Sequence, residues 1–350
     1  MTAANPAGEC GPEAVRPAPA WPRPWLLADI GGTNVRFGWL AEGAAEVSHV
    51  ATLRGADHRG PAQAAQAYLA GLAQALGPAY RAPRAGAFAV ATAVGGDHIE
   101  LTNSGWAFSC EATRGELGLD QLRVLNDFEA LALSLPRLRP TQVRVIGPAL
   151  AGGPDAAARG ALAVIGPGTG LGVAGLLPTA QGWVAVPGEG GHASLSAADE
   201  FESQLLAVVR REYAHVSAER LLSGIGLPVL HRAVAAVLGA PADTLGAGEI
   251  VERGLSGLDD VCSRSLDAFC ALLGGFAGNV ALVLGARGGV YIGGGIVPRL
   301  GERFFESRFR ERFEAKGRFQ PYLRAIPTAL ITDTLVALSG AAAALAPRNR

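Results

Sequence analysis

The feature that most restricts the fold is a hairpin-like segment, Trp25 to Leu40. In it an apolar run ends at Asp29, turns through Gly-Gly-Thr-Asn and continues as a second apolar run. A similar pattern returns at 162–177, and a third segment, 288–300, is an apolar run that breaks into three glycines before helix-like spacing. Any one of these could be an ordinary tight turn. Together they predict a duplicated α/β protein with a nucleotide between its halves, because glycine turns present backbone N–H groups to phosphate.

The rest of the chain alternates between β-rich runs and helical patterns, which predicts an α/β fold. Helical spacing is present at 62–76, 201–213 and 262–284, a strand is predicted at 86–94, and a short strand leading into a helix is predicted at 122–135. Residues 1–24 are rich in Pro and Ala without periodicity, and we expect them to form a disordered tail.

The composition excludes several partners. Of the 350 residues, 49% are hydrophobic and 17% are charged, with a net charge of −1. Such a balance, without long basic runs, argues against nucleic acid or an anionic membrane as the main partner. Lys316 is the only lysine and the P-loop motif is absent, so phosphate binding here cannot depend on a P-loop lysine.

The cysteines indicate neither a disulfide framework nor a metal site. Cys10, Cys110, Cys262 and Cys270 are scattered and lack metal-ligand spacing, and the last two fit buried positions of one helix. No apolar stretch reaches about 18 residues without a glycine or a polar break, so we predict no membrane span. We therefore expect a reduced, cytoplasmic protein.

Asp29 is an unusual residue for the end of a strand that enters a glycine turn. Magnesium in proteins prefers one or two carboxylates together with waters and phosphate oxygens. A carboxylate beside a phosphate-binding turn therefore suits a Mg²⁺ site, with Asp29 acting through water. The alternative is structural: Asp29 could accept a hydrogen bond from the amide of Thr33 or Asn34, and both roles can coexist.

Asn126 and Asp127 follow an apolar strand at its carboxyl end, where open α/β sheets place their ligand groups. This position favours a role in binding or catalysis. The same pair could instead cap the following helix, because Asn is a good N-cap and Asp interacts well with the helix dipole.

Two further segments add polar groups. The loop P-G-E-G-G-H-A-S contains Glu189 and His192, and Glu219 follows in what we expect to be the first turn of a helix capped by Ser217. With Asn126 and Asp127 these residues offer hydrogen-bond acceptors and few cations. Such a set suits a neutral polyhydroxylated ligand, a sugar, whose hydroxyls donate to carboxylates. A lone histidine without neighbouring Cys or His is a poor metal ligand, so His192 more plausibly bonds a sugar hydroxyl.

These motifs together resemble bacterial glucokinases of the hexokinase–actin superfamily. The resemblance runs from about Leu26 to about Leu345. It rests on seven motifs in the family's order: D-I-G-G-T-N-x-R, T-N-x-x-W-A-F-S, N-D-F, G-x-G-T-G-L-G, P-G-E-G-G-H, H-V-S-A-E-R-x-L-S-G-x-G and G-G-G-I-V-P-R. Pro167 and the tail are mild departures from the family pattern.

The resemblance implies ATP-dependent phosphorylation of D-glucose at its 6-hydroxyl, with Mg²⁺, by a cytosolic homodimer. It implies a two-domain hexokinase/actin-like (ribonuclease H-like) α/β fold with a ligand cleft between the domains. We expect a small domain at 25–136 plus 332–350, with the first phosphate hairpin and the catalytic Asp. We expect a large domain at 137–331, with the second hairpin, the sugar loop and the adenosine site.

Carried over by motif, Asp127 resembles the general base. The expected glucose ligands are Asn126, Glu189, His192 and Glu219, with Asn103 lining the same cleft. The expected nucleotide contacts are Ala28, Asp29, Ile30, Gly31, Gly32 and Thr33 in the first hairpin, Gly168, Thr169 and Gly170 in the second, and Gly293, Gly294 and Gly295 on the adenosine side.

Two alternatives use the same fold. A kinase of the repressor–ORF–kinase group, acting on another hexose such as N-acetylmannosamine, would share the Glu-x-Gly-His loop, but those proteins usually carry a Cys-rich zinc motif after it, and 193–224 contains no cysteine. A sugar-responsive transcription factor would need an N-terminal DNA-binding module. The Pro/Ala-rich segment before the first strand, with two arginines in 1–24, is too short for one.

Overall fold

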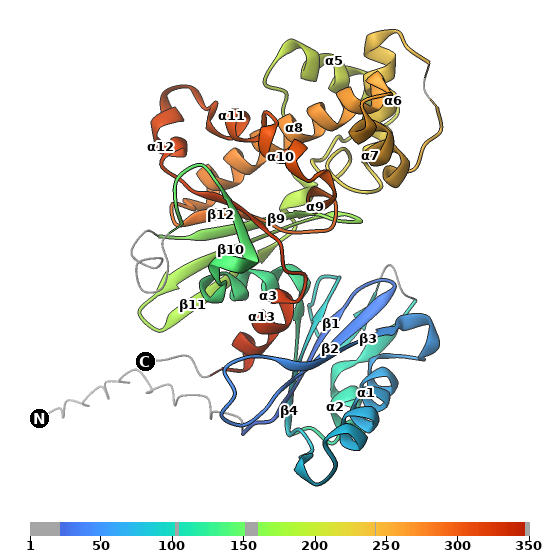
Figure 1. The fold of residues 1–350 in the computed structure, drawn as a ribbon, viewed down its shortest axis with the longest axis vertical. Helices are drawn as coiled ribbons and strands as arrows, with labels where there is room; N and C mark the ends of the chain where they lie inside the picture. The colour runs from blue at the N-terminus through green and yellow to red at the C-terminus, as the bar shows by residue number, and fades with distance from the viewer. Residues whose placement is uncertain (1–21, 102–104, 151–159, 242, 347–350) are drawn as a thin grey trace, which may run out of the picture.

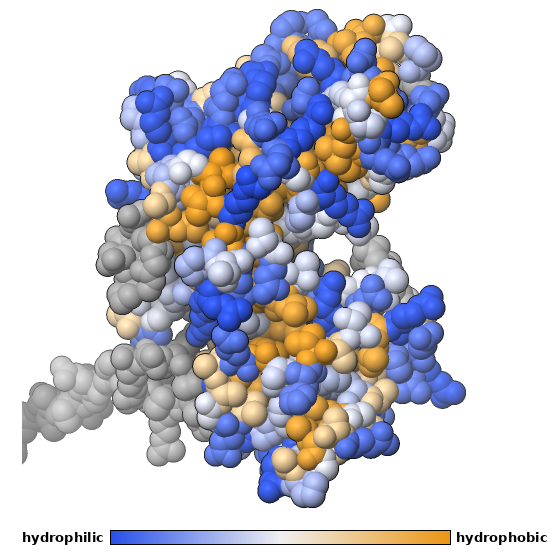
Figure 2. Space-filling view, viewed as in Figure 1, coloured by the Kyte–Doolittle hydropathy of each residue, from blue (hydrophilic) through white to orange (hydrophobic). Residues whose placement is uncertain are grey.

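The computed structural model describes residues 22–101, 105–150, 160–241 and 243–346. The chain forms two lobes, each built on one β-sheet, with two helices packed between the sheets (Figure 1). The space-filling view shows a hollow between the two lobes (Figure 2).

The first sheet has the strand order β3-β2-β1-β4-β7. β1 (Trp25–Ile30), β2 (Asn34–Leu40) and β3 (Ser48–Arg54) form an antiparallel meander, and β4 (Ala85–Val90) and β7 (Gln121–Asn126) extend it in parallel from β1. β4 is buried along its whole length, as expected for a central parallel strand. The strand predicted at 86–94 is thus present, but it ends earlier than expected, at Val90.

The second sheet has the order β11-β10-β9-β12-β13-β8 and repeats this plan. β9 (Leu162–Pro167), β10 (Leu171–Thr179) and β11 (Gly182–Gly188) are antiparallel, and β12 (Gly289–Ile292) and β13 (Thr328–Ile331) continue in parallel from β9. β8 (Val143–Ile146) adds an antiparallel edge strand. The shared order of three antiparallel and two parallel strands confirms the predicted duplication.

Helices cover the outer faces of both sheets. In the first lobe, α1 (Pro61–Leu76) packs over β2 and β3, and its Tyr68 ring stacks on Phe37 at 5.2 Å between centroids. In the second lobe a larger core joins β9, β10 and β12 to several helices. The remaining helices are α2 (Cys110–Glu116), α5 (Glu200–Val209), α6 (Leu227–Leu238), α7 (Ala247–Ser256), α8 (Asp260–Leu284), α9 (Val297–Leu300), α10 (Glu302–Glu306), α11 (Phe309–Glu314) and α12 (Gln320–Arg324).

Two helices lie between the sheets, α3 (Asp127–Ser134) and α13 (Val336–Leu345) (Figure 1). α13 packs on β1 and β4, and α3 packs on β9, β10 and β11. The two helices cross so closely that a Cβ at Gly340 would overlap the carbonyl oxygen of Ala130, so only glycine fits there. Because α3 begins at Asp127, this packing sets where that residue lies relative to both sheets.

α8 is long and apolar enough to cross a membrane by length and composition, but most of its most apolar window is buried inside the protein. Cys262 and Cys270 are among its buried residues, as the sequence predicted. The apolar character of α8 is therefore that of a core helix.

Candidate active site

The first glycine turn joins β1 to β2. The Gly31 amide donates to the carbonyl of Asn34 at 3.0 Å, and the Gly55 amide donates to the carbonyl of Thr33 at 2.9 Å. Asp29 lies opposite Arg36 in the antiparallel register, and Arg36 Nη1 donates to Asp29 Oδ2 at 3.1 Å. The turn is thus closed by backbone bonds, and the Asp29 carboxylate is held by a cation from the neighbouring strand.

The Asp29 carboxylate is largely buried, with 17% of its side chain exposed. Burial raises its pKa, and the charge and hydrogen bond of Arg36 oppose that rise. Arg36 is therefore the group that favours the charged form of this carboxylate. The sequence motif contained this arginine, but spacing alone did not reveal that it pairs with Asp29.

The second glycine turn, Gly168 to Gly170, joins β9 to β10. The Gly168 amide donates to the Gly170 carbonyl at 2.8 Å. A distant segment supports this turn: the Gly224 amide donates to the Gly168 carbonyl at 2.7 Å, and the Leu171 amide donates to Glu219 Oε2 at 2.8 Å. The turn is therefore held in place by the segment that carries Glu219.

The three glycines after β12 lie against this second turn. The Gly293 amide donates to the Ile165 carbonyl at 2.7 Å, and the Ile296 amide donates to the Pro167 carbonyl at 3.2 Å. The short helix α9 follows directly, as the sequence predicted. Two of the three glycine segments identified in the sequence are thus adjacent in the fold.

Asn126 and Asp127 divide the two roles that the sequence left open. Asn126 is the N-cap of α3: its Oδ1 accepts from the amides of Phe128 at 2.9 Å and Glu129 at 3.3 Å, and its Nδ2 donates to the Thr92 carbonyl at 3.1 Å. Asp127 is the first residue of the helix, and its Oδ1 accepts from the Phe128 amide at 2.9 Å. Capping therefore uses Asn126, and Asp127 shares only the Phe128 amide with it.

The environment of Asp127 raises its pKa to about 7. Burial is the main cause, and the negative charges of Asp29 and Glu189 add to it, while hydrogen bonds from the backbone amides of Phe128 and Asp127 oppose it. The acids of the first hairpin and of the glycine-rich loop are thus close enough to Asp127 for their charges to act on it.

Phe128 connects α3 to the second hairpin. A Cβ at Gly172 in β10 would overlap the Phe128 ring, and a Cβ at Gly166 in β9 would lie 2.6 Å from it. The ring therefore occupies space that only glycines leave open between these strands. The sequence analysis did not identify this contact, because a glycine in each of two apolar strands gives no sign of which side chain packs on it.

Glu189, His192 and Glu219 come together although the last is far from the others in sequence. Glu189 precedes the short 3₁₀ helix Gly190–His192 and His192 Nε2 lies 3.9 Å from Glu219 Oε1. The Glu219 amide donates to the Gly191 carbonyl at 2.9 Å, and the Ala218 amide donates to the Ala193 carbonyl at 2.9 Å. Backbone bonding thus fixes this group as a unit.

The expected helix at Ser217 is not present. Ser217 forms an isolated β-bridge with Ser194, residues 218–226 form turns and bends, and α6 begins only at Leu227. Ser217 Oγ does accept from the Arg220 amide at 3.2 Å, a capping-type bond without a helix behind it. The backbone amides of this segment instead bond the 191–195 loop and the second hairpin. These tertiary hydrogen bonds replace the local ones that a helix would make. Asn103 lies outside the described residues.

The comparisons with known proteins agree with this geometry. The family model described as glucokinase matches residues 26–348. The chain is 49% identical over 326 residues to a glucokinase of Paramagnetospirillum magneticum, covering 93% of this chain and 98% of that one. It is 50% identical over 330 residues to a glucokinase of Chromobacterium violaceum, covering 93% and 90%.

Solved structures show the same fold. The crystal structure of a glucokinase from an Antarctic psychrotroph matches with a TM-score of 0.83 and 39% identity, over 92% of this chain and 98% of that one. A ROK hexokinase from Thermus thermophilus matches with a TM-score of 0.63 at 18% identity, over 93% and 98%, which shows the fold alone. The predicted hexokinase/actin-like α/β fold is confirmed. Because the similarity extends from the first hairpin through α13, the chain belongs to the bacterial glucokinase family.

Proposed function

We propose that the protein transfers the γ-phosphate of ATP to the 6-hydroxyl of D-glucose, giving glucose 6-phosphate and ADP in glycolysis. The observation that carries this proposal is the position of Asp127. Its carboxylate is partly buried at the start of α3, within the influence of the charges of Asp29 in the first hairpin and Glu189 in the sugar loop. Membership of a family of ATP-dependent hexose kinases supports the same reaction.

Asp127 would act as the general base that accepts the proton of the attacking hydroxyl. A base works best when its pKa lies near the working pH, and burial raises the pKa of Asp127 to about 7. The carboxylate is also positioned by a rigid element, because α3 is packed between the two sheets. Phosphoryl transfer depends mainly on such alignment and on charge neutralisation.

Glucose would be held by Glu189, His192 and Glu219, together with Asn126 and Asn103. The carboxylates accept from sugar hydroxyls, and His192 lies beside Glu219 with its side chain 63% exposed and so accessible to a ligand. Asn126 uses Oδ1 for two accepted bonds and one Nδ2 hydrogen for the Thr92 carbonyl, so its second Nδ2 hydrogen is the group left to donate to a sugar hydroxyl. A solved glucokinase of this fold, from Balamuthia mandrillaris, was determined in complex with glucose.

ATP would be held by the two glycine hairpins and the third glycine segment. The contacts that we propose are those of Ala28, Asp29, Ile30, Gly31, Gly32 and Thr33, of Gly168, Thr169 and Gly170, and of Gly293, Gly294 and Gly295 on the adenosine side. The close pairing of Gly293 with β9 supports the grouping of the last two segments.

The site fits a magnesium ion carried by the nucleotide rather than by the protein. Among the described residues, no group of three or more His, Cys, Asp or Glu could hold a metal. One buried carboxylate, Asp29, is what Mg²⁺ needs when phosphates and waters supply the other ligands. Asp29 would hold the ion through water, and the ion would neutralise phosphate charge.

The family resemblance also leads us to propose a cytoplasmic homodimer of two-domain subunits. The small domain would comprise 25–136 and 332–350, and the large domain 137–331. Sedimentation of the purified chain, which separates one subunit of 35.8 kDa from a pair, tests the dimer.

A coupled assay across a panel of hexoses and phosphoryl donors tests the activity. We expect glucose with ATP to give the highest kcat/KM, and ADP formation to require Mg²⁺. A preference for another hexose or an amino sugar, such as N-acetylmannosamine, would instead support the related-kinase alternative. Sugar binding without turnover would support a regulator.

A further inference from the structure

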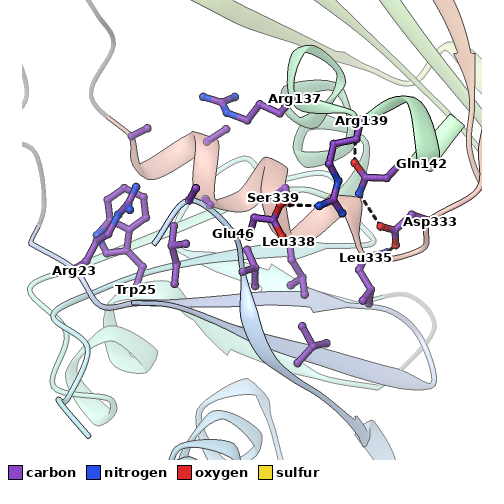
Figure 3. Close-up of a pocket in the computed structure, with 17 residues that line it drawn as sticks. Arg23, Trp25, Glu46, Arg137, Arg139, Gln142, Asp333, Leu335, Leu338 and Ser339 are labelled. Atoms are coloured by element: carbon purple, nitrogen blue, oxygen red, sulfur yellow. Dashed lines mark hydrogen bonds and ion pairs between the residues drawn. The ribbon is translucent and has the colours of Figure 1, made fainter. Parts of the chain in front are cut away.

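A separate pocket of about 540 Å³ lies where the chain passes between the two sheets (Figure 3). None of the proposed glucose or nucleotide residues lines it. We call it the connector pocket; it is lined by Arg23, Trp25, Leu40, Ala45, Glu46, Val47, Val50, Arg137, Arg139, Gln142, Asp333, Leu335, Leu338, Ser339, Ala342, Ala343 and Ala346.

The walls of the connector pocket include both crossings of the chain. The chain leaves the first sheet through α3 and reaches β8 by way of 135–142, and it returns from β13 to α13 through 332–335. The two crossings are bonded to each other: Gln142 Nε2 donates to Asp333 Oδ2 at 2.7 Å, and the Thr332 amide donates to the Gln142 carbonyl at 2.9 Å. A ligand here would contact both crossings, the β2–β3 loop and α13 at once.

The charged residues of the pocket are unevenly paired. Arg139 Nη1 donates to Glu46 Oε1 at 2.6 Å, and Asp333 accepts from Gln142 and from the Leu335 amide. Arg23 donates to the Ala44 carbonyl and lies over the Trp25 ring at 4.8 Å.

Arg137 donates to the Leu133 carbonyl at 3.2 Å. Within the described part of the chain, neither Arg23 nor Arg137 has an ion pair with a carboxylate. The pocket is therefore lined by three arginines and two acids, Glu46 and Asp333, which leaves one positive charge in excess, and two of the arginines have no carboxylate partner.

We propose that the connector pocket binds a small organic phosphate. A phosphate monoester is an anion that carries close to two negative charges at neutral pH, and the pocket offers it an excess of positive charge with two guanidinium groups that no carboxylate occupies. Arginine suits phosphate because its planar fork donates two hydrogen bonds. The remainder of the ligand would lie on apolar side chains such as Val50, Leu335 and Leu338. A volume of about 540 Å³ lies within the range of pockets for small ligands.

The acid Glu46 gives the proposal a second, opposite test. It is exposed and pairs with Arg139, so it competes with an incoming anion for that guanidinium. Removing its charge frees Arg139 and removes a repulsion. The Glu46→Gln variant should therefore bind the phosphate more tightly, whereas Arg137→Ala should bind it more weakly.

Isothermal titration of the full chain provides the measurement, with inorganic phosphate, glucose 6-phosphate and AMP as separate probes. We expect saturable binding of at least one organic phosphate. Arg137→Ala should weaken that binding about tenfold or more, Glu46→Gln should tighten it by a few-fold, and the exposed Arg318→Ala, outside the pocket, should leave it unchanged. Added salt should weaken it, because the pocket is open to solvent.

The same titrations show where a probe binds. Glucose 6-phosphate and AMP could also enter the site around Asp127, but affinity there should not respond to Arg137 or Glu46. Binding that neither substitution changes, or no saturable binding of any probe, overturns the proposal. Saturation with inorganic phosphate alone, with neither organic probe bound, overturns the organic ligand class. If the melting curve shows that Arg137→Ala does not fold, the Glu46→Gln variant provides the test: tighter phosphate binding supports the proposal, and unchanged binding overturns it.

Discussion

At the scale of single residues, the neighbouring residues Asn126 and Asp127 have different roles: Asn126 caps α3, and Asp127 is available for chemistry. The helix needs one capping side chain, and Asn126 supplies it with two hydrogen bonds to backbone amides. Asp127 is partly buried, the charges of Asp29 and Glu189 act on it, and its pKa rises to about 7. A capping residue would not need such a costly environment, so the burial of Asp127 points to a chemical role.

The first prediction concerns the rate of Asp127→Asn. Asn has nearly the same size and can still hydrogen-bond a sugar, but it cannot accept a proton. We expect kcat to fall by about two to four decades while glucose binding stays within about tenfold of wild type. Steady-state kinetics, with folding checked by circular dichroism, measure this. A kcat within about threefold of wild type would show that Asp127 is not the base.

The second prediction concerns the stability of the same variant. The folded-state pKa of Asp127, about 7, exceeds its ordinary value of 3.8, so the folded state retains a proton that the unfolded state loses. Asp127 therefore costs stability progressively as pH rises from about 4 to about 7, and the cost stays constant above that. Its upper limit is about 4 kcal/mol.

Asp127→Asn removes this cost. The melting temperature of the variant relative to wild type should rise between pH 4 and pH 7 and then level off. Thermal melts at pH 4, 5.5, 7 and 8 measure this difference, with Asp243→Asn as an exposed control. A difference independent of pH would contradict the raised pKa.

At the scale of elements, the segment 216–226 joins two parts of the site that the sequence treats separately. Its amides at Ala218 and Glu219 bond the sugar loop, and its Gly224 amide bonds the second glycine turn. Glu219 itself reaches both, with Oε1 3.9 Å from His192 and Oε2 accepting from the Leu171 amide. The sugar loop and the phosphate hairpin are therefore mechanically connected.

The third prediction separates Glu219 from Glu189. Both Gln substitutions should raise the glucose KM, because a neutral acceptor binds a hydroxyl less strongly than a carboxylate. Only Glu219→Gln should also weaken nucleotide binding, by about fivefold, because it loses a charge-assisted bond to the hairpin. Titration with a non-hydrolysable ATP analogue without glucose isolates this effect, and Glu189→Gln is the matched control. Equal nucleotide affinity in both variants would show that Glu219 does not support nucleotide binding by the hairpin.

At the scale of the whole molecule, the two lobes are held together by α3 and α13 and by the two chain crossings. The first described residues lead into β1, and the buried core of the first lobe includes Leu26, Phe37 and Phe88. Nothing in the sequence of residues 1–22 provides a periodic apolar face to add to it.

The fourth prediction is therefore that the tail is dispensable. Deleting residues 1–22 should leave kcat and the melting temperature nearly unchanged, since no motif or periodic pattern is lost. Activity assays and differential scanning calorimetry on the truncated and full chains compare the two. A drop of several degrees in the melting temperature would show that the tail packs on the folded protein.

The sequence by itself determined the local features of this protein. Each glycine hairpin, the strand and helix around Asp127, and the helix predicted at 262–284 follow from short-range patterns, because turn residues and apolar periodicity act within a few residues of each other. The composition and the order of the motifs also led to the family. These features depend on residues that are close together in the chain, so the sequence alone predicts them.

Only the tertiary structure decided the relations between distant residues. It pairs Arg36 with Asp29, packs Phe128 against Gly172, and joins Glu219 to the Leu171 amide. It also replaces the predicted helix at Ser217 with turns, because the amides there bond the sugar loop and the second hairpin instead. The physical reason is that a backbone amide or a buried charge takes the partner that packing brings to it, and packing depends on the whole fold.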